Sequence, residues 1–459
     1  MTRRRSGLIA LALPLLLAGC ASVSPDPGFG EVQAAARAHL GRELAWTQDA
    51  AGRAALRAQV SALLSRPLSV DDAVQVALLN NRGLQAAFQE LGIAHAELLR
   101  ASRPANPHVS LLNASRLHDG VREFKIEQAF LVNLVSAFTL PQAVAIEERR
   151  LAQARQAAIL TVLQLAADTR KAWYQAVAAE EILGYRKQVS EAAAVGAELA
   201  ARMARAGNWS ALDQAREHRF SAEAALGEAR AQLERRQARE RLIRLLGLWG
   251  DDIGFALPQR LPALPAEPAD RPELEQLAMG RRIDLMMARL EIEAQARQLG
   301  LTRSSRFINV LELGPARVLE GERNAGYKRG VEVSFELPLF DQGGARLARA
   351  QAIHQQALER AAQAAIEARS QVREAYDALR TRWDIARHHR DELLPISRRI
   401  ADENLLRYNG MFIGVFELLA DARAQVASVM EAIEANRDFW LAQSDLDMAL
   451  LGPAGKGNP

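Results

Sequence analysis

The sequence predicts a mainly α-helical protein in which long helices form two similar hairpins and a smaller part of the chain forms strands. Three observations predict this fold class. About 65 residues from Gln142 to Gly207 contain no proline and are rich in strong helix formers. Most of the pattern around this stretch occurs a second time later in the chain. Segments in which apolar and polar residues alternate precede the long helical segments.

The long helical stretch sets the scale of the molecule. Its apolar residues recur at spacings of three and four, for example at Ile159, Leu163 and Ala166. At about 1.5 Å per residue, such a helix is about 100 Å long, several times the length of an average globular helix. A helix of this length cannot be buried in one compact core. It must therefore pack lengthwise against other helices.

The first residues have the pattern of a bacterial lipoprotein signal. Three arginines precede the apolar segment 7–17, and Leu17-Ala18-Gly19-Cys20 matches a lipobox. We expect residues 1–19 to be a signal peptide and Cys20, the single cysteine of the chain, to carry a covalent lipid. The alternative is an ordinary signal peptide that happens to contain a cysteine. Lipoproteins that have a small residue such as Ala21 after the cysteine usually continue to the outer membrane.

Charge and composition exclude several classes of function. The formal net charge is +3, and removing the three arginines of residues 1–19 leaves zero, so no electrostatic argument for nucleic acid remains. No other apolar run approaches 18 residues, so a membrane crossing would have to use strands. The eight histidines are scattered and show no metal-ligand spacing. We therefore expect no enzyme activity, and no cofactor other than the lipid on Cys20.

The order of predicted elements divides the chain into six segments. In the first repeat, strands are expected at His108–Leu117 and Val121–Phe138, followed by the helix from Gln142 and a return helix at Ser210–Leu246. The segments are 1–19 (signal peptide), 20–66 (lipidated extension), 67–247 (first repeat), 248–270 (proline-rich linker), 271–452 (second repeat) and 453–459 (disordered tail).

The second repeat has the same predicted order. One helix is expected from 271 to about 302, then strands at Arg306–Leu313 and Tyr327–Phe340. A helix from Ala345 to about Tyr408 follows, and its Pro395 should kink or break it. When the two halves are aligned with an offset of 201 residues, Leu84 matches Leu285. With a small drift, Phe138 falls on Phe340 and the Leu-Leu-Gly run at 245–247 falls on that at 450–452. This order indicates an internal duplication.

The strands carry a two-residue period. Val331, Val333 and Phe335 alternate with polar and charged residues, which suits a strand between lipid and a wet lumen. The same pattern also suits a half-buried strand of a soluble sheet. Four strands among very long helices have no evident soluble core to cover, and lipid does not tolerate open sheet edges. Known single-chain barrels need eight or more strands, so several chains must contribute strands. The protein is thus expected to be an oligomer.

The chain resembles the TolC-like outer-membrane efflux factors of the lipoprotein kind over nearly its whole length after residue 19. The residues that carry the resemblance are LSVDDAV at 68–74, Asn80-Asn81, FELPLFDQG at 335–343, the two helix turns and the paired Leu-Leu-Gly ends. The resemblance implies a homotrimer with a 12-stranded β-barrel in the outer membrane, to which each chain gives four strands. It also implies an α-barrel of packed helices in the periplasm, and strand residues Val331, Val333 and Phe335 that face lipid.

This resemblance implies the exit duct of a tripartite efflux system, which passively conducts substrates received from an inner-membrane pump and a periplasmic adaptor. The general character is similar to the outer-membrane components of heavy-metal resistance pumps, although the sequence shows no metal ligand and does not identify the cargo. The alternative is a non-transporting lipoprotein that acts as a coiled-coil scaffold or adaptor. Two hairpins, each with its own strand pair, favour the duct, because adaptors usually have one hairpin.

In the family, the two helix turns form the periplasmic tip, where an adaptor docks and the tunnel closes. The resemblance assigns adaptor docking to Gly207, Asn208, Trp209, Gly410, Met411 and Phe412. The alternative is that the apolar side chains among them tuck between helices of the tip.

An acid just past each turn, Asp213 and Glu417, fits the family's periplasmic gate. A further family acid would fall at Ala420, and Asp421 lies beside it. The alternative is a favourable charge near a helix N-terminus. The arginines available to balance these acids are Arg202, Arg205, Arg216, Arg407 and Arg423.

Overall fold

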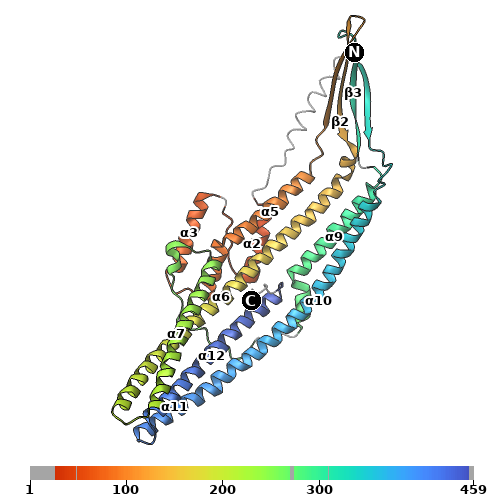
Figure 1. Ribbon diagram of the computed structural model, residues 1–459. Coiled ribbons are helices and arrows are strands. Elements are labelled where there is room, and N and C mark those ends of the chain that lie inside the picture. The colour runs from red at the N-terminus through yellow and green to blue at the C-terminus, as the bar shows by residue number, and fades with distance from the viewer. Residues whose placement is uncertain (1–25, 48, 269–272, 309, 454–459) are drawn as a thin grey trace. The chain divides into compact units, whose positions relative to one another are not determined.

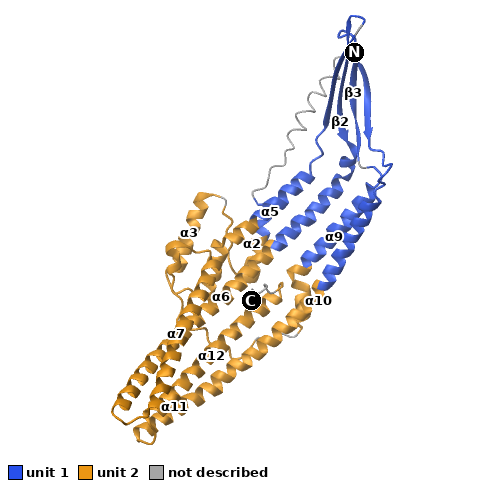
Figure 2. Ribbon diagram, in the orientation of Figure 1, with its two compact units in different colours: residues 1–31, 89–157, 286–363 blue, residues 32–88, 158–285, 364–459 orange. Residues whose placement is uncertain are grey.

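The computed structural model describes residues 26–47, 49–268, 273–308 and 310–453. Cys20 and the tail after residue 453 lie outside the described residues. The chain divides into two compact units, and each unit contains parts of both repeats (Figure 2). The first unit takes in residues 89–157 and 286–363 with the described residues before Val32. The second takes in the described residues of 32–88, 158–285 and 364–459.

Helices make up most of the chain (Figure 1). None of the helices in the described part has an apolar stretch of the length and purity that a membrane crossing requires. The elements are α2 (Phe29–Leu40), α3 (Ala50–Leu64), α4 (Val70–Asn80), α5 (Arg82–Ala101), β1 (His108–His118), β2 (Val121–Asn133), α6 (Leu134–Arg205), α7 (Ala211–Leu246), the 3₁₀ turn η1 (Gly250–Gly254), α8 (Leu274–Arg281), α9 (Ile283–Ser304), β3 (Leu311–Gly321), β4 (Lys328–Phe335), α10 (Gly344–His388), the π-helical turn η2 (His389–Leu393), α11 (Leu394–Asn409) and α12 (Val415–Ala449).

The four strands form one antiparallel sheet in the first unit, in the order β1-β2-β3-β4. The pairing of β2 with β3 omits Gly314 and Pro315. Proline has no N–H to donate, and a Cβ on Gly314 would lie 1.7 Å from the carbonyl oxygen of Phe130. Glycine is therefore required where these two strands approach each other most closely.

Helix α6 begins earlier than predicted. It starts at Leu134, so the prediction that a strand continues to Phe138 and that the helix begins at Gln142 was wrong. The side-chain oxygen of Asn133 accepts a hydrogen bond from the backbone N–H of Ser136 at 2.9 Å and so caps the new helix. Pro141 then lies inside α6, where it removes a single backbone donor.

The strands of the second repeat are also shifted from their predicted positions. The prediction of Arg306–Leu313 and Tyr327–Phe340 was wrong, because β3 is Leu311–Gly321 and β4 is Lys328–Phe335. Pro338 cannot donate to a strand ladder, which explains why β4 ends before it. Pro315, in contrast, is accommodated by the gap in the β2–β3 pairing.

Pro395 neither ends nor visibly breaks its helix. A π-helical turn between α10 and α11 precedes it, in which the N–H of Leu394 bonds to the carbonyl of His389. In a regular helix, the proline ring would clash with the carbonyl four residues earlier. The wider turn relieves this clash and lets the helix continue.

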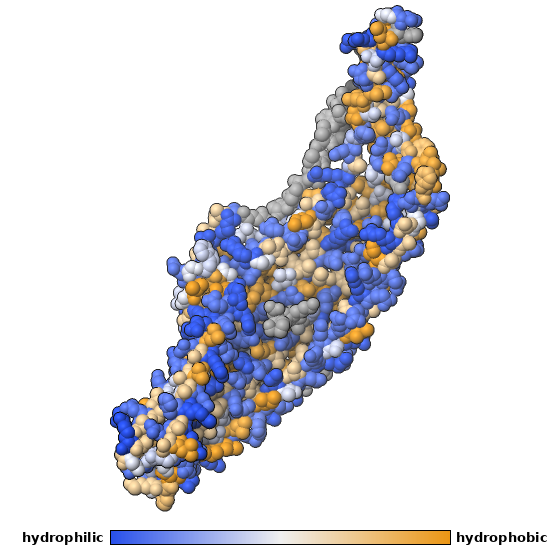
Figure 3. Space-filling model, in the orientation of Figure 1, coloured by the Kyte–Doolittle hydropathy of each residue, from blue (hydrophilic) through white to orange (hydrophobic). Residues whose placement is uncertain are grey.

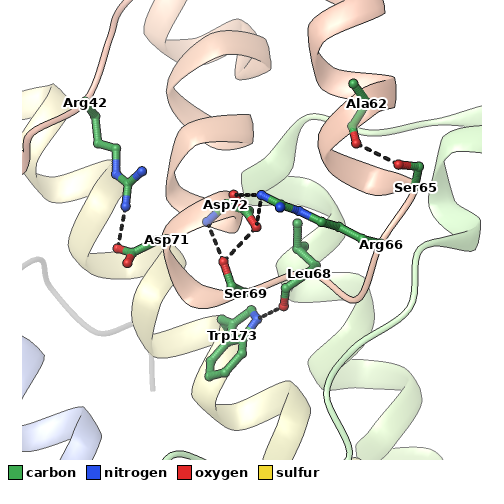
Figure 4. A network of polar contacts seen from close by, with 9 residues as sticks. All are labelled: Arg42, Ala62, Ser65, Arg66, Leu68, Ser69, Asp71, Asp72 and Trp173. Atoms are coloured by element: carbon green, nitrogen blue, oxygen red, sulfur yellow. Dashed lines mark hydrogen bonds and ion pairs between the residues drawn. The ribbon is translucent and has the colours of Figure 1, made fainter.

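A network of polar contacts surrounds the amino end of α4 in the second unit (Figure 4). The Ser69 hydroxyl accepts a hydrogen bond from the backbone N–H of Asp72 at 3.1 Å, so the predicted helix cap is confirmed. The Trp173 indole N–H donates to the carbonyl of Leu68 at 2.8 Å, which ties α6 to the start of α4. The Arg42–Asp71 ion pair at 2.7 Å adds a link to the preceding extension.

The two repeats meet in an aromatic cluster in the second unit. Tyr174 of α6 stacks on Trp440 of α12 with ring centroids 5.4 Å apart, and burial raises the pKa of Tyr174 to about 12. The proline-rich linker is held against the same helices. The carbonyl of Pro262 accepts hydrogen bonds from Asn436 and Trp440 at 3.0 and 3.2 Å. The linker is therefore a packed part of the second unit.

Candidate functional site

The sheet separates apolar from charged side chains more completely than the sequence pattern of one strand indicates. Pairing puts Val333 opposite Leu313, and Leu313 opposite Val132, so these three side chains share one face. We call this the apolar face. Nine exposed large apolar residues lie on it: Val109, Leu111, Leu117, Phe130, Val132, Leu313, Val331, Val333 and Phe335.

The opposite face of the sheet is charged. It carries only two exposed large apolar residues, Leu112 and Val121. Its charged members are Arg116, Glu123, Lys125, Glu127, Glu312, Glu320, Lys328 and Glu332. Several of them pair with one another, such as Lys125 with Glu127 at 2.9 Å. Figure 3 shows hydrophobic surface over the strands and mainly hydrophilic surface at their far tips.

Part of this separation is not visible in the sequence of a single strand. The stretch after Gln128 blurs the two-residue period, so Phe130 and Val132 were not assigned to the face that contains Phe335. The signal that could have found them is strand register, which requires the pairing partners and not only the alternation along one strand. Exposed aromatic side chains follow at the helical ends of the strands, at Phe138, Phe307 and Phe340.

The two helical turns belong to the second unit and have nearly the same backbone. In the first, Gly207 has φ of 75° and its N–H bonds to Ala204, while the N–H of Asn208 bonds to Met203. In the second, Met411 has φ of 62° and its N–H bonds to Tyr408, while the N–H of Phe412 bonds to Arg407. Both are Schellman motifs. Gly410, which the sequence places at the turn, has an ordinary negative φ of −80°.

The apolar residues of the turns divide into two groups. Met411 is 92% exposed and Phe412 80% exposed. Trp209 instead packs edge-on against Phe416, with ring centroids 3.6 Å apart. Trp209 therefore follows the alternative that the sequence left open, since it tucks between the two hairpins. Met411 and Phe412 form an exposed apolar surface at the second turn.

Asp213 binds neighbouring residues at the start of its own helix, α7. The Ser210 hydroxyl donates to its carboxylate at 2.7 Å, and Arg216 donates to it at 3.0 Å. Of the five predicted arginine partners, only Arg216 contacts one of the three predicted acids. Glu417 lies exposed in the first turn of α12. Asp421 accepts a hydrogen bond from Asn404 across its own hairpin.

Near the tips, an ion pair joins the two hairpins through Glu217, an acid that was not predicted from the sequence. Arg423 of α12 donates to Glu217 of α7 at 2.7 Å, and the two side chains are 22% and 13% exposed. The Arg423 guanidinium also lies 3.7 Å from the ring centroid of Phe220. Glu217 follows Asp213 by four residues, as Asp421 follows Glu417. This shared spacing is the signal that could have identified Glu217.

The sheet and the turns thus offer an apolar face, a charged face, an exposed apolar turn and ion pairs between helices. Among the described residues, no cluster of three or more His, Cys, Asp or Glu side chains is placed to hold a metal ion.

No protein-family model matches the chain. It is 29% identical over 287 residues to the cobalt-zinc-cadmium resistance protein CzcC of Cupriavidus metallidurans, a match that covers 61% of this chain. The match spans 65% of that relative, just under two thirds of its length.

Solved structures match more of the chain. CmeC, the outer membrane channel of Campylobacter jejuni, has a TM-score of 0.71 at 16% identity, over 83% of this chain and 85% of that one. A membrane protein of Pseudomonas aeruginosa has a TM-score of 0.67 at 20% identity, over 83% and 93%. The fold that the resemblance implied is thereby confirmed: the chain has the fold of the TolC-like outer-membrane efflux channels.

Proposed function

We propose that this protein is the outer-membrane exit duct of an efflux system, a passive channel built from three copies of the chain. The observation that carries this proposal is the sheet, which has one apolar and one charged face and ends in two edge strands, β1 and β4. Hydrocarbon offers no hydrogen-bond partner to an open strand edge. Strands from further copies must therefore complete the sheet, and three copies give a 12-stranded barrel.

In this barrel, the apolar face with Val331, Val333 and Phe335 contacts lipid, and the charged face lines a wet lumen. An arginine at Phe335 should then destabilise the barrel by about 2–4 kcal/mol near the bilayer midplane, and by less near its edge. Phe335→Arg and Glu332→Arg form a matched pair on the two faces. Heat-modifiable migration of the purified oligomer reports their assembly. Normal assembly of Phe335→Arg with failure of Glu332→Arg would reverse the assignment.

The chain is anchored, on this proposal, by a lipid on Cys20 in the outer membrane, with the helical part in the periplasm. The lipobox at 17–20 supports the anchor. Mass spectrometry of the mature protein should find an acylated N-terminal Cys20, and Cys20→Ser should abolish the modification. An unmodified Cys20, or a mature N-terminus at another residue, would exclude the anchor.

We infer the cargo from the relative CzcC, and we infer adaptor docking from the exposed apolar residues of the second turn. The name of CzcC concerns resistance to cobalt, zinc and cadmium, so we assign export of such divalent ions to this chain. An inner-membrane pump supplies them, and a periplasmic adaptor docks on Met411 and Phe412, which are too exposed to contribute to packing. Deletion of the gene should sensitise cells to these three metals but not to an unrelated organic toxin. Equal sensitivity to both would show a different cargo.

At the periplasmic end, we assign the closed state of the duct to the hairpin tips. Three copies of Asp213 and Glu417 put six carboxylates around the opening. These negative charges repel one another and attract cations. The Glu217–Arg423 pair holds the two hairpins of each copy together. Asp213→Ala with Glu417→Ala should raise single-channel conductance in planar bilayers and weaken block by divalent cations. Conductance and block equal to those of the parent would place the gate elsewhere.

The planar-bilayer recording also tests the function itself. Purified protein should form discrete, long-lived conductance steps without any nucleotide or partner. A preparation that migrates as a heat-modifiable oligomer but never conducts would favour a scaffold over a duct.

A further inference from the structure

Two arginines lie directly opposite each other on the apolar face of the sheet. Arg317 of β3 pairs in register with Arg329 of β4, and both side chains are exposed. Arg317 donates to the side chain of Gln128 and lies 5.0 Å from the ring centroid of Tyr327. Like charges directly opposite each other destabilise a sheet. An anion between the two guanidinium groups would remove this repulsion.

The pair lies at the end of the continuous exposed apolar rows on this face. Beyond it, among the described residues, Leu319 is buried, Ile126 is half-buried, and Leu117 is the one exposed large apolar residue. Toward the helical ends of the strands, the next cross-strand row contains Val331, Pro315, Phe130 and Val109, and further apolar rows follow. Beyond Phe335 the chain reaches Phe340, which is fully exposed. Six residues of strand lead from Arg329 to Phe335. At about 3.3 Å per residue and a tilt of about 40° they cover roughly 15 Å along a barrel axis, within the roughly 25 Å height of an apolar band.

Aromatic residues flank both ends of this band, as expected at membrane interfaces. Phe138, Phe307 and Phe340 lie exposed toward the helices. At the other end, Tyr327 contacts Arg317, and Phe124 has the guanidinium of Arg323 5.8 Å from its ring centroid. The arginine pair is therefore at the level where lipid head groups begin.

A shallow groove of about 490 Å³ connects the pair to the apolar rows. Its lining changes from charged to apolar along its length. The residues that line it on this face are Arg317, Arg329, Gln128, Leu111, Val109, Phe130 and Pro315.

We propose that Arg317 and Arg329 bind the phosphate of an anionic membrane lipid, whose acyl chain lies in this groove. The inference rests on the proposed function, since it requires the apolar face to contact lipid. Guanidinium groups bind phosphate through paired N–H donors, which neutralises the facing charges. The apolar end of the groove provides the contact area that a free phosphate ion cannot use. The lipid thus fixes the depth of the barrel at its outward boundary.

The test uses purified full-length protein in detergent and native mass spectrometry. Phosphatidic acid and phosphatidylcholine with identical acyl chains are offered at equal concentration. The parent protein should retain about tenfold more phosphatidic acid than phosphatidylcholine. The double variant Arg317→Gln with Arg329→Gln should retain the two lipids equally. Lys125→Gln with Lys328→Gln is the matched control, because it also removes two positive charges, both from the opposite face, and it should keep the preference. Arg317→Lys with Arg329→Lys should keep part of it.

Three results would overturn the proposal. They are equal retention of both lipids by the parent, an unchanged preference in the double glutamine variant, and displacement of the lipid by inorganic phosphate at equal concentration. The last would show that the apolar wall contributes nothing.

Heat-modifiable migration of the same samples separates this inference from the proposed function. An oligomer without lipid preference refutes the lipid site alone. A parent protein that forms no heat-modifiable oligomer refutes the barrel itself.

Discussion

At equivalent positions, the two repeats use different side chains to bind the end of the return helix. An offset of 201 places Asn81 on Arg282, and a short helix ends at each of these positions. Asn81 donates to the carbonyl of Leu245 at 2.9 Å, and Arg282 donates to the carbonyl of Ala449 at 2.9 Å. The last carbonyl groups of a helix have no hydrogen-bond partner within it. Each of these side chains donates a hydrogen bond to such a carbonyl at the end of a return helix. The position requires a hydrogen-bond donor. How much stability is lost when the side chain is removed depends on whether that donor is neutral or charged.

The second repeat depends on a buried charge. Arg282 is 1% exposed and is held by Asp284 at 2.6 Å and Gln371 at 2.9 Å. Asn81 is neutral and also accepts a hydrogen bond from the N–H of Leu84 at 2.9 Å, which caps α5. Loss of a neutral amide leaves unpaired dipoles, whereas loss of the arginine leaves the carboxylate of Asp284 without its counter-charge.

The largest predicted difference between the repeats follows from this contrast. Arg282→Ala should lower the free energy of unfolding by about 3–5 kcal/mol. Asn81→Ala should lower it by about 1–3 kcal/mol. Arg281→Ala is the control, since that exposed neighbour should change stability by less than about 0.5 kcal/mol. Denaturant unfolding followed by circular dichroism measures all three. Equal losses for Arg282→Ala and Asn81→Ala would show that the charge is irrelevant.

A second contrast concerns the acids near the tips. Glu217 pairs with Arg423 of the other hairpin, whereas Asp421 bonds to Asn404 within its own hairpin. Arg423→Met should cost about 1–3 kcal/mol of stability and raise single-channel conductance, because it removes the ion pair that joins α12 to α7 near the tips. Asn404→Ala should reduce stability without raising conductance. Arg219→Gln, an exposed neighbour on α7, should change neither. A conductance rise in Asn404→Ala alone would reverse the roles of the two acids.

The smallest predicted effect concerns the turns. Met411 stands where the first repeat has Gly207, in the same left-handed conformation, which a residue with a Cβ adopts at a cost. Met411→Gly should therefore stabilise the protein by about 0.5–1 kcal/mol, and Gly207→Ala should destabilise it by about the same amount. If Met411 serves docking, the more stable Met411→Gly variant should lose adaptor binding in a pull-down. Unchanged binding would make the methionine dispensable for docking.

The sequence predicts the helices and the duplication well because both depend on local patterns. Helix periodicity, the Ser69 cap and the Leu-Leu-Gly ends are visible within a few residues of chain. The strand limits were wrong at Phe138 and in the second repeat, where the predicted strand continued through Pro338 although β4 ends at Phe335. Pro141 lies inside α6, and Pro315 lies inside β3 at a gap in its pairing with β2, where a backbone donor is not needed.

The candidate sites were less predictable because they depend on contacts between distant segments. The apolar face requires strand register, which no single strand carries. The pair of Glu217 with Arg423 joins residues 206 positions apart, and the sequence pointed to Asp213 instead. Trp209 could be expected either to face solvent or to tuck between hairpins, and only its contact with Phe416 decides between them.

The central claim is that three copies close one barrel through the edge strands β1 and β4. The most direct test places one cysteine in β1, at Ser110, Leu112 or Ala114 in turn, together with Ser334→Cys in β4. After oxidation in membranes, at least one combination should give a disulfide-linked trimer on a denaturing gel, and each single-cysteine variant should give none. Monomers or dimers alone in every combination would contradict the trimeric barrel.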